Sequence, residues 1–135
     1  SVDLSRPYCL WARRNLELNG ITAKEHRVEN SDVFAFLDRA PGEAWDMIII
    51  DPPTFSTSKK MDYVFDIKKD HSRLIRQALP LLKREGTILF STNARKFQMD
   101  PALSGEAEIR EITEETIPAD FQQHRPHQCW VVKKG

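Results

Sequence analysis

Runs of apolar residues alternate along this chain with stretches whose apolar positions recur at helical spacing. Residues 45–50 (WDMIII) and 87–92 (TILFST) are apolar at nearly every position, which is typical of parallel strands buried on both faces. Weaker strand patterns lie at residues 1–4, 24–28, 108–113 and 128–133. We expect the last two of these strands to form an antiparallel edge of the sheet.

The segments between the strands carry start and stop signals of helices. Ser5 is a suitable N-cap, Pro7 is tolerated in the first turn, and Asn19-Gly20 ends the helix. Ser31-Asp32 opens a second helix, which Pro41-Gly42 stops.

A third helix is predicted over residues 67–84, after a polar loop from Thr54 to Asp66. Pro80 lies inside this pattern and should kink the helix or split it in two. A loop or short helix is expected between Asn93 and Gly105. This alternation of strand and helix predicts an α/β fold, with an open parallel sheet and helices on both faces.

Composition narrows the class of protein. With 135 residues and 40% hydrophobic content, the chain suits a single domain with a core of its own. Twenty basic residues balance twenty acidic ones, so the totals give no basic nucleic-acid footprint. No apolar run approaches the ~18 residues of a membrane helix, and we expect a cytoplasmic protein without membrane contact. Cys9 and Cys129 are expected to be reduced core thiols, and no metal is expected, because His124 and His127 lack further ligands nearby.

Three carboxylates follow predicted strands. Asp3 follows the first strand, Asp32 comes shortly after the second, and Asp51 ends the third. Ligands of open α/β sheets bind outside the carboxyl ends of the strands, so these residues are candidates as a set. For Asp3 and Asp32 the alternative is a carboxylate that favours a helix start, and for Asp51 it is a turn-forming residue before proline.

The stretch Asp51-Pro52-Pro53 suits the binding of a base edge. Pro52 pushes Asp51 toward extended geometry, and both prolines fix their own φ and lack an amide hydrogen. The result is a rigid turn with carbonyl acceptors beside a carboxylate, which complements a ring that carries donors. Phe55 is either a stacking face for that ring or part of the core.

These residues resemble a known family. Asp-Pro-Pro after a buried strand resembles the catalytic motif of the S-adenosylmethionine-dependent methyltransferases that modify nucleic-acid bases. Further segments of the same family are resembled by VDLS, by the helix ending in ELNG, and by ENSDVFAFL. More specifically, the guanine-N7 half of the bifunctional bacterial 23S rRNA guanine methyltransferases is resembled by DPPTFSTSKKM, FDIKKDH, LFSTNARKF and HQCWVV. The resemblance covers essentially all 135 residues. It implies a Rossmann-like, mostly parallel sheet with an antiparallel last strand.

One feature of that family has no counterpart in the chain. The first strand and the glycine-rich loop that wraps the cofactor's methionine part are missing, so residues 1–135 are expected to be a partial methyltransferase domain of a longer protein. The missing strand belongs between those ending at Asp3 and Asp51. We expect these two strands to pair directly, or a second chain to fill the gap as in a homodimer.

The resemblance also assigns roles. S-adenosylmethionine is the implied cofactor, held by Asp3 at the ribose and by Asp32 and Val33 at the adenine, with Ser5 as a further cofactor-binding residue. Asp51, Pro52 and Pro53 are implied to hold the target base in 23S rRNA. On the RNA side, we expect contacts from Phe55, Arg95 and Lys96.

Several alternatives stay open. The basic pairs Lys59-Lys60, Lys68-Lys69 and Arg95-Lys96 are either phosphate contacts or solvated surface, and His71 either orients Asp51 or its loop or is a packed helix residue. An exocyclic amine such as guanine N2 is an alternative target to N7. Methylation of a pyrimidine C5 usually needs a nucleophilic cysteine near the motif, and none follows Asp-Pro-Pro. The chain could also be an inactive fragment that only contacts RNA.

Overall fold

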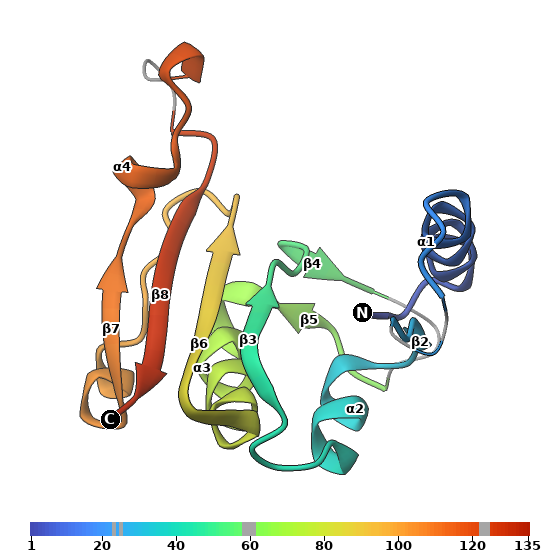
Figure 1. The fold of residues 1–135 in the computed structure, drawn as a ribbon. Coiled ribbons are helices and arrows are strands. Elements are labelled where there is room, and N and C mark those ends of the chain that lie inside the picture. Colours follow the sequence, from blue (N-terminus) through green and yellow to red (C-terminus); the bar gives the residue numbers. More distant parts are fainter. Residues whose placement is uncertain (23, 25, 58–61, 122–124) are drawn as a thin grey trace. The chain divides into compact units, whose positions relative to one another are not determined.

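The computed structural model describes residues 1–22, 24, 26–57, 62–121 and 125–135 (Figure 1). The chain divides into two compact units, Ser1–Ala40 and Pro41–Gly135. Each unit has its own strands and helices, and each is described by itself.

The first unit contains two short parallel strands and two helices. In order they are β1 (Val2–Asp3), α1 (Arg6–Leu18), β2 (Glu29–Asn30) and α2 (Val33–Arg39). Val2 pairs with Glu29 and Asp3 with Asn30. The strand predicted at residues 24–28 is therefore wrong in position. The partner strand β1 sets the position of β2, because the Glu29 amide donates a 2.8 Å hydrogen bond to the Ser1 carbonyl.

The predicted limits of both helices in this unit are confirmed. Ser5 caps α1 and accepts a long 3.5 Å hydrogen bond from the Tyr8 amide, with Pro7 in the first turn. Asn19 is the C-cap, and Gly20 takes a φ of 69°, which L-residues with a side chain rarely adopt. Asp32 caps α2, and the helix ends before Pro41-Gly42.

The second unit is built on a four-stranded sheet. Its strands are β3 (Trp45–Ile50), β6 (Leu82–Thr92), β7 (Ala107–Glu111) and β8 (Gln128–Lys134), in the order β3-β6-β8-β7. β3 and β6 are parallel, and β8 is antiparallel to both β6 and β7. The antiparallel edge is confirmed. On its other side β3 pairs with no strand of the described residues, so the direct pairing predicted between the strands ending at Asp3 and Asp51 is not found there. That a second chain fills this edge stays a prediction.

Shorter elements connect these strands. They are β4 (Phe55–Ser56), β5 (Phe65–Asp66), α3 (Ile67–Ala78), α4 (Thr113–Thr116) and three 3₁₀ helices at Leu79–Leu81, Pro101–Gly105 and Ala119–Phe121. β4 and β5 form an antiparallel pair within the segment predicted as a polar loop, so that prediction missed them. The 3₁₀ helix at Pro101–Gly105 fits the expected short helix before Gly105.

The third predicted helix ends earlier than expected. α3 stops at Ala78, Pro80 lies in a 3₁₀ turn, and Leu82 already begins β6. Pro80 cannot donate the hydrogen bond that would continue an α-helix. The chain then turns back so tightly that a Cβ on Gly86 would come within 3.0 Å of the Trp45 carbonyl oxygen, which explains the glycine at that position.

One face of this sheet carries the core. Ile88, Phe90 and Thr92 on β6 are buried, whereas the residues between them are half-buried. The prediction of β3 as a strand buried on both faces is wrong, since Met47 is 59% and Ile49 67% exposed. Helix α3 packs against the face that carries Phe90, through His71. Figure 1 shows α3 behind β6.

The loop after β6 is tied to α3 through His71. Its Nδ1 lies 2.9 Å from the Ile67 carbonyl oxygen, and its Nε2 accepts from the Asp100 amide at 3.0 Å. This pairing requires the tautomer with the proton on Nδ1. The ring also packs edge-on against Phe97, with 4.8 Å between centroids. His71 is therefore a packed helix residue that holds the loop, and among the described residues its ring contacts Ile67, Asp100 and Phe97 and not Asp51.

The Asp100 carboxylate completes this tie. It accepts from the Ser72 hydroxyl at 2.6 Å and from the Ala102 amide at 2.9 Å. The Ser72 hydrogen bond is the main reason why the pKa of Asp100 lies below its ordinary value, and the Ala102 amide and the charge of Arg76 add to it. The ionised carboxylate therefore stabilises the loop between β6 and β7.

Truncation of Phe90 tests the core. Phe90→Ala should lower the free energy of unfolding by about 3–5 kcal/mol, because it empties a fully buried site between Phe97 and Trp130. Urea denaturation measures this loss. Phe121→Ala removes a ring that is 49% exposed and should change stability by about 0.5 kcal/mol or less. Equal losses in the two variants would contradict the assigned core.

The Asp100 carboxylate predicts a pH dependence. A pKa lowered by folding contributes stability above the unfolded value of about 3.9, and this stability is lost as the pH falls through the folded value. Asp100→Asn should therefore be less stable than the wild type at pH 7, and the gap should shrink below about pH 4. Urea unfolding at pH 7, 5 and 3 measures it. Asp120→Asn is the matched control at an exposed position, and a gap that stays constant to pH 3 would refute the prediction.

Candidate functional site

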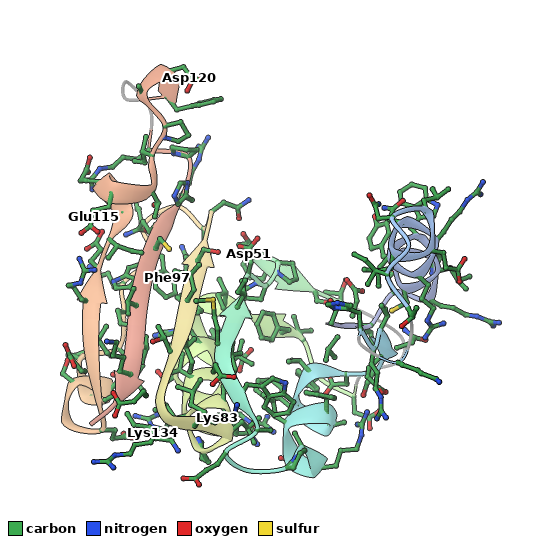
Figure 2. The ribbon with its side chains drawn as sticks, viewed as in Figure 1. Asp51, Lys83, Phe97, Glu115, Asp120 and Lys134 are labelled. Carbon is green, nitrogen blue, oxygen red and sulfur yellow. The ribbon has the colours of Figure 1, made fainter. Side chains whose placement is uncertain are left out.

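Asp51 leaves the sheet at the carboxyl end of β3, directly after the buried Ile50. Because β3 and β6 are parallel, with Ile50 opposite Phe90, the next residues along both strands meet at the same edge. There the Ser91 hydroxyl donates a 2.8 Å hydrogen bond to Asp51 Oδ1. Figure 2 shows Asp51 at the tip of β3. The Asp51 carboxylate is exposed, as a residue that receives a ligand must be.

The turn that follows is fixed at both ends. Pro52 is half-buried and Pro53 exposed. Thr54 then donates from Oγ1 to Asn93 Oδ1 at 3.2 Å, and its carbonyl accepts from the Ile67 amide at 3.2 Å. These bonds connect the Asp-Pro-Pro turn to the end of β6 and to the start of α3. The two prolines thus stand in a turn that is restrained by its neighbours as well as by its own rings.

Phe55 lies on β4 and is 60% exposed. The alternative that it belongs to the core is therefore wrong. Its ring offers an apolar face to solvent three residues after the Pro52 position, as a stacking surface for a base requires. The role itself stays a prediction.

Arg95 and Lys96 lie in the loop that follows β6, and both are exposed. Neighbouring residues hold this loop to the core, since the Ala94 amide donates to Thr92 Oγ1 at 3.1 Å and Phe97 is buried. Lys96 has a φ of 56°, in the left-handed region that residues with a side chain rarely adopt. In the described part of the chain, no carboxylate forms an ion pair with either side chain. Both charges remain available to a ligand.

A cysteine also lies beside this edge. Cys129 on β8 is opposite Ser91 in the ladder and is buried. Burial raises the pKa of the Cys129 thiol, and the negative charge of Asp51 raises it further. The group is therefore a protonated thiol at neutral pH, which is the unreactive form. The expectation of two buried free cysteines is confirmed for Cys9 and Cys129 alike.

The first unit brings Asp3 and Asp32 to one edge. Asn30 Nδ2 donates to the Asp3 carbonyl at 3.1 Å, and the Ser31 amide donates to the same oxygen at 3.1 Å. The carboxylates of Asp3 and Asp32 also accept hydrogen bonds at the starts of α1 and α2, which is the alternative role considered for both residues. Asp3 Oδ1 accepts from the Ser5 amide at 2.6 Å, and Asp32 Oδ1 accepts from the Ala35 amide at 3.0 Å.

The predicted site residues thus fall into two groups. Asp3, Ser5, Asp32 and Val33 belong to the first unit, and those around Asp51 belong to the second. Within the second group, sequence reasoning missed Ser91 and Asn93. Both stand in the quoted stretch LFSTNARKF, and the signal that identifies them is the end of a parallel strand next to β3.

Some expectations are not tested by the described residues. Lys59, Lys60 and His124 lie outside them. Lys68 and Lys69 are exposed in the first turn of α3, which is compatible with both of their alternatives. Across the described ranges, no three His, Cys, Asp or Glu side chains gather closely enough to hold a metal ion, and no helix is long and apolar enough to cross a membrane.

Comparison with known proteins finds close relatives in sequence. The ribosomal RNA large subunit methyltransferase K of Neisseria meningitidis serogroup B is 42% identical over 135 residues, which is 98% of this chain and 38% of that protein. The ribosomal RNA large subunit methyltransferase K/L of Marinomonas sp. is 44% identical over 134 residues, again 98% of this chain but 18% of the relative. The chain thus spans well under half the length of these relatives. No family model matches it.

Solved structures share the fold. SMU.776, described as a candidate methyltransferase and solved in a complex with SAH, superposes with a TM-score of 0.69 at 25% identity, over 98% of this chain and 38% of its own. The SAM-dependent methyltransferase of Agrobacterium tumefaciens gives a TM-score of 0.65 at 15% identity, over 98% and 47% of the two chains. The chain is therefore homologous over nearly its whole length to a segment of the ribosomal RNA large subunit methyltransferases K and K/L, and it has the Rossmann-like α/β fold of the S-adenosylmethionine-dependent methyltransferases.

Proposed function

We propose that residues 1–135 are part of one methyltransferase domain that transfers a methyl group from S-adenosylmethionine to N7 of a guanine in 23S ribosomal RNA. The observation that carries this proposal is the exposed Asp51 carboxylate, which the Ser91 hydroxyl holds at the end of β3 ahead of a rigid Pro-Pro turn. The names of the homologues, which are ribosomal RNA methyltransferases, support the substrate class.

The first unit would bind the cofactor. Asp3 is exposed at the end of β1, and only its Oδ1 has a hydrogen-bond partner among the described residues. The other oxygen suits the adjacent hydroxyls of a ribose, which are donors. Asp32 and Val33 at the start of α2, together with Ser5, would line the adenosine part. The SAH bound to SMU.776, which is S-adenosylmethionine without its methyl group, supports this choice of cofactor.

The second unit would hold the base. Guanine presents N1–H and an exocyclic amino group on one edge, and a carboxylate accepts from both. Asp51 and the carbonyls at Pro52 and Pro53 would take this edge, while Phe55 stacks on the ring. Arg95 and Lys96 would contact the RNA backbone, because their charges are exposed and unpaired in the described part of the chain. A base that is paired in RNA must first leave its stack to reach such a site.

Methyl transfer to guanine N7 mainly requires that the base and the cofactor are held in the correct orientation. The bound cofactor supplies a methyl group on a sulfonium. Guanine N7 has a free lone pair, so the N–C bond forms as the C–S bond breaks, and no general base has to remove a proton. Orientation of two reactants can supply about 7–11 kcal/mol of a barrier. Within this proposal Asp51 binds and orients the base and transfers no proton.

Cys129 bears on the alternative target at a pyrimidine C5. The fold does bring a cysteine to the Asp-Pro-Pro edge, which the sequence did not reveal. However, Cys129 is buried and its pKa is raised, so it does not present the accessible thiolate that nucleophilic attack needs. This observation favours a nitrogen target. Guanine N7 and the exocyclic amine are then distinguished by identifying the methylated nucleoside in the product.

Cofactor binding is tested by thermal unfolding. Saturating S-adenosylmethionine, at 100 times its dissociation constant, should stabilise the chain by about 2.7 kcal/mol and raise its melting temperature by several degrees. Asp3→Ala should remove most of this rise, because the ribose hydroxyls lose their acceptor. Asp38→Ala, which removes an exposed carboxylate from α2, is the matched control and should keep it. A chain that shows no rise would count against the cofactor assignment and would favour a role restricted to RNA contact.

The role of Asp51 is tested by methyl transfer. Asp51→Ala should lower the rate of transfer to ribosomal RNA by about 100-fold or more, the usual scale for one positioned polar group, and should keep the cofactor-induced rise in melting temperature. Cys129→Ala should retain transfer, because its thiol takes no part. Radiolabelled methyl incorporation measures both, and nuclease digestion identifies the product. Full activity in Asp51→Ala, or loss of transfer in a folded Cys129→Ala, would overturn the assignment.

A further inference from the structure

We propose that Ser91 is a positioning residue that fixes the orientation of the Asp51 carboxylate for the target base. This inference rests on the proposed function, since it assigns a task to a residue of the same site. It adds a side chain from β6, a strand to which the sequence assigned no role.

The two partners differ in how firmly they are held. Ser91 lies within β6, which is hydrogen-bonded to β3 on one side and to β8 on the other, and its own ladder partner is Cys129. Asp51 lies beyond the end of β3, is exposed, and is followed by two prolines that donate no hydrogen bond. Ser91 is therefore the fixed partner, and Asp51 is the side chain that gains its orientation from the contact.

The contact with Ser91 involves only one of the two carboxylate oxygens of Asp51. Ser91 Oγ donates to Oδ1 at 2.8 Å, a normal length for a hydroxyl and a carboxylate. Oδ2 has no hydrogen-bond partner among the described residues. A carboxylate offers about four lone-pair sites, so Oδ2 and the remaining site on Oδ1 are left for the donors of a ligand. The hydrogen bond to Oδ1 thus also fixes the direction in which Oδ2 points.

Two neighbouring hydroxyls show that the bond is not a general feature of β6. Thr92 points to the buried face and accepts from the Ala94 amide, so its hydroxyl caps the next loop. Thr87 shares the half-buried face with Ser91, and no hydrogen bond of its hydroxyl is seen in the described structure. A hydroxyl on this face therefore does not need an acceptor for the sheet to form, and the Ser91 contact is specific to Asp51.

Cys129 lies next to the pair formed by Ser91 and Asp51. The negative charge of Asp51 contributes to the raised pKa of this thiol, which sits across the ladder from Ser91. The geometry that places the carboxylate is the hydrogen bond from Ser91, whose ladder partner on β8 is Cys129. The Asp51 carboxylate therefore lies at the shared end of these strands and is still exposed to a ligand.

The first test measures the side chain of Asp51 directly. In the wild type, NMR scalar couplings should show one Asp51 χ1 rotamer. In Ser91→Ala they should average toward several rotamers, because an exposed carboxylate without its donor rotates freely. Ser91→Thr keeps the hydroxyl and should restore the single rotamer. Thr87→Ala is the control from the same strand and face. A single rotamer in Ser91→Ala would overturn the proposal.

The second test is a double-mutant cycle on methyl transfer to ribosomal RNA. Ser91→Ala should lower kcat/KM by about 10- to 100-fold, the scale of one hydrogen bond to a charged group, and leave the cofactor-induced rise in melting temperature unchanged. In an Asp51→Ala background the same change should have almost no further effect, since it acts through Asp51. Ser91→Thr should recover most of the rate, and Thr87→Ala should keep it.

The outcomes separate the two proposals. Equal losses from Ser91→Ala in the wild-type and Asp51→Ala backgrounds would mean that Ser91 acts independently of Asp51, which would overturn the positioning role. No turnover by the wild type under any condition would instead overturn the proposed function. The rotamer measurement does not depend on turnover, so it would still decide whether Ser91 orients Asp51.

Discussion

The parallel pairing of β3 with β6 is the constraint on which the candidate site depends. It aligns the ends of the two strands, so that Asp51 from one and Ser91 from the other come within hydrogen-bond distance although 40 residues separate them. A shift of one residue in this register would turn the side chains of one strand to the opposite face and separate the pair. The burial of Ile88 and Phe90 against α3 fixes the register, because a slipped strand would lose that core.

The same core supports the loop that follows β6. Phe97 returns from this loop to pack between His71 and Trp130, and Asp100 bonds to Ser72 and to His71. Between these anchors, Arg95 and Lys96 are exposed. A polar cluster with every member hydrogen-bonded is rigid. The basic residues are therefore presented from a segment that is held at both ends.

The two faces of β3 differ in burial. The inner face of the sheet is covered by α3, whereas Met47 and Ile49 expose apolar side chains on the other face of β3. Apolar runs are ordinarily read as strands buried on both faces, and here that interpretation was right about the strand and wrong about its surroundings. The run gives no information on which neighbour covers it, because hydrophobicity records a tendency to be buried and not the partner.

Local signals determined much of this protein. Capping residues and glycines placed the ends of α1 and α2, Asp51-Pro52-Pro53 marked the turn after β3, and the segment from DPPTFSTSKKM to LFSTNARKF indicated the methyltransferase fold that the comparisons confirm. These features depend on residues close together in the chain. Tertiary structure decided the position of β2, the pairing of β4 with β5 and the early end of α3. It also decided the hydrogen bonds that join Ser91 to Asp51 and Thr54 to Asn93. Each depends on a partner distant in sequence, and the energy of such a pairing exists only once the strands have come together.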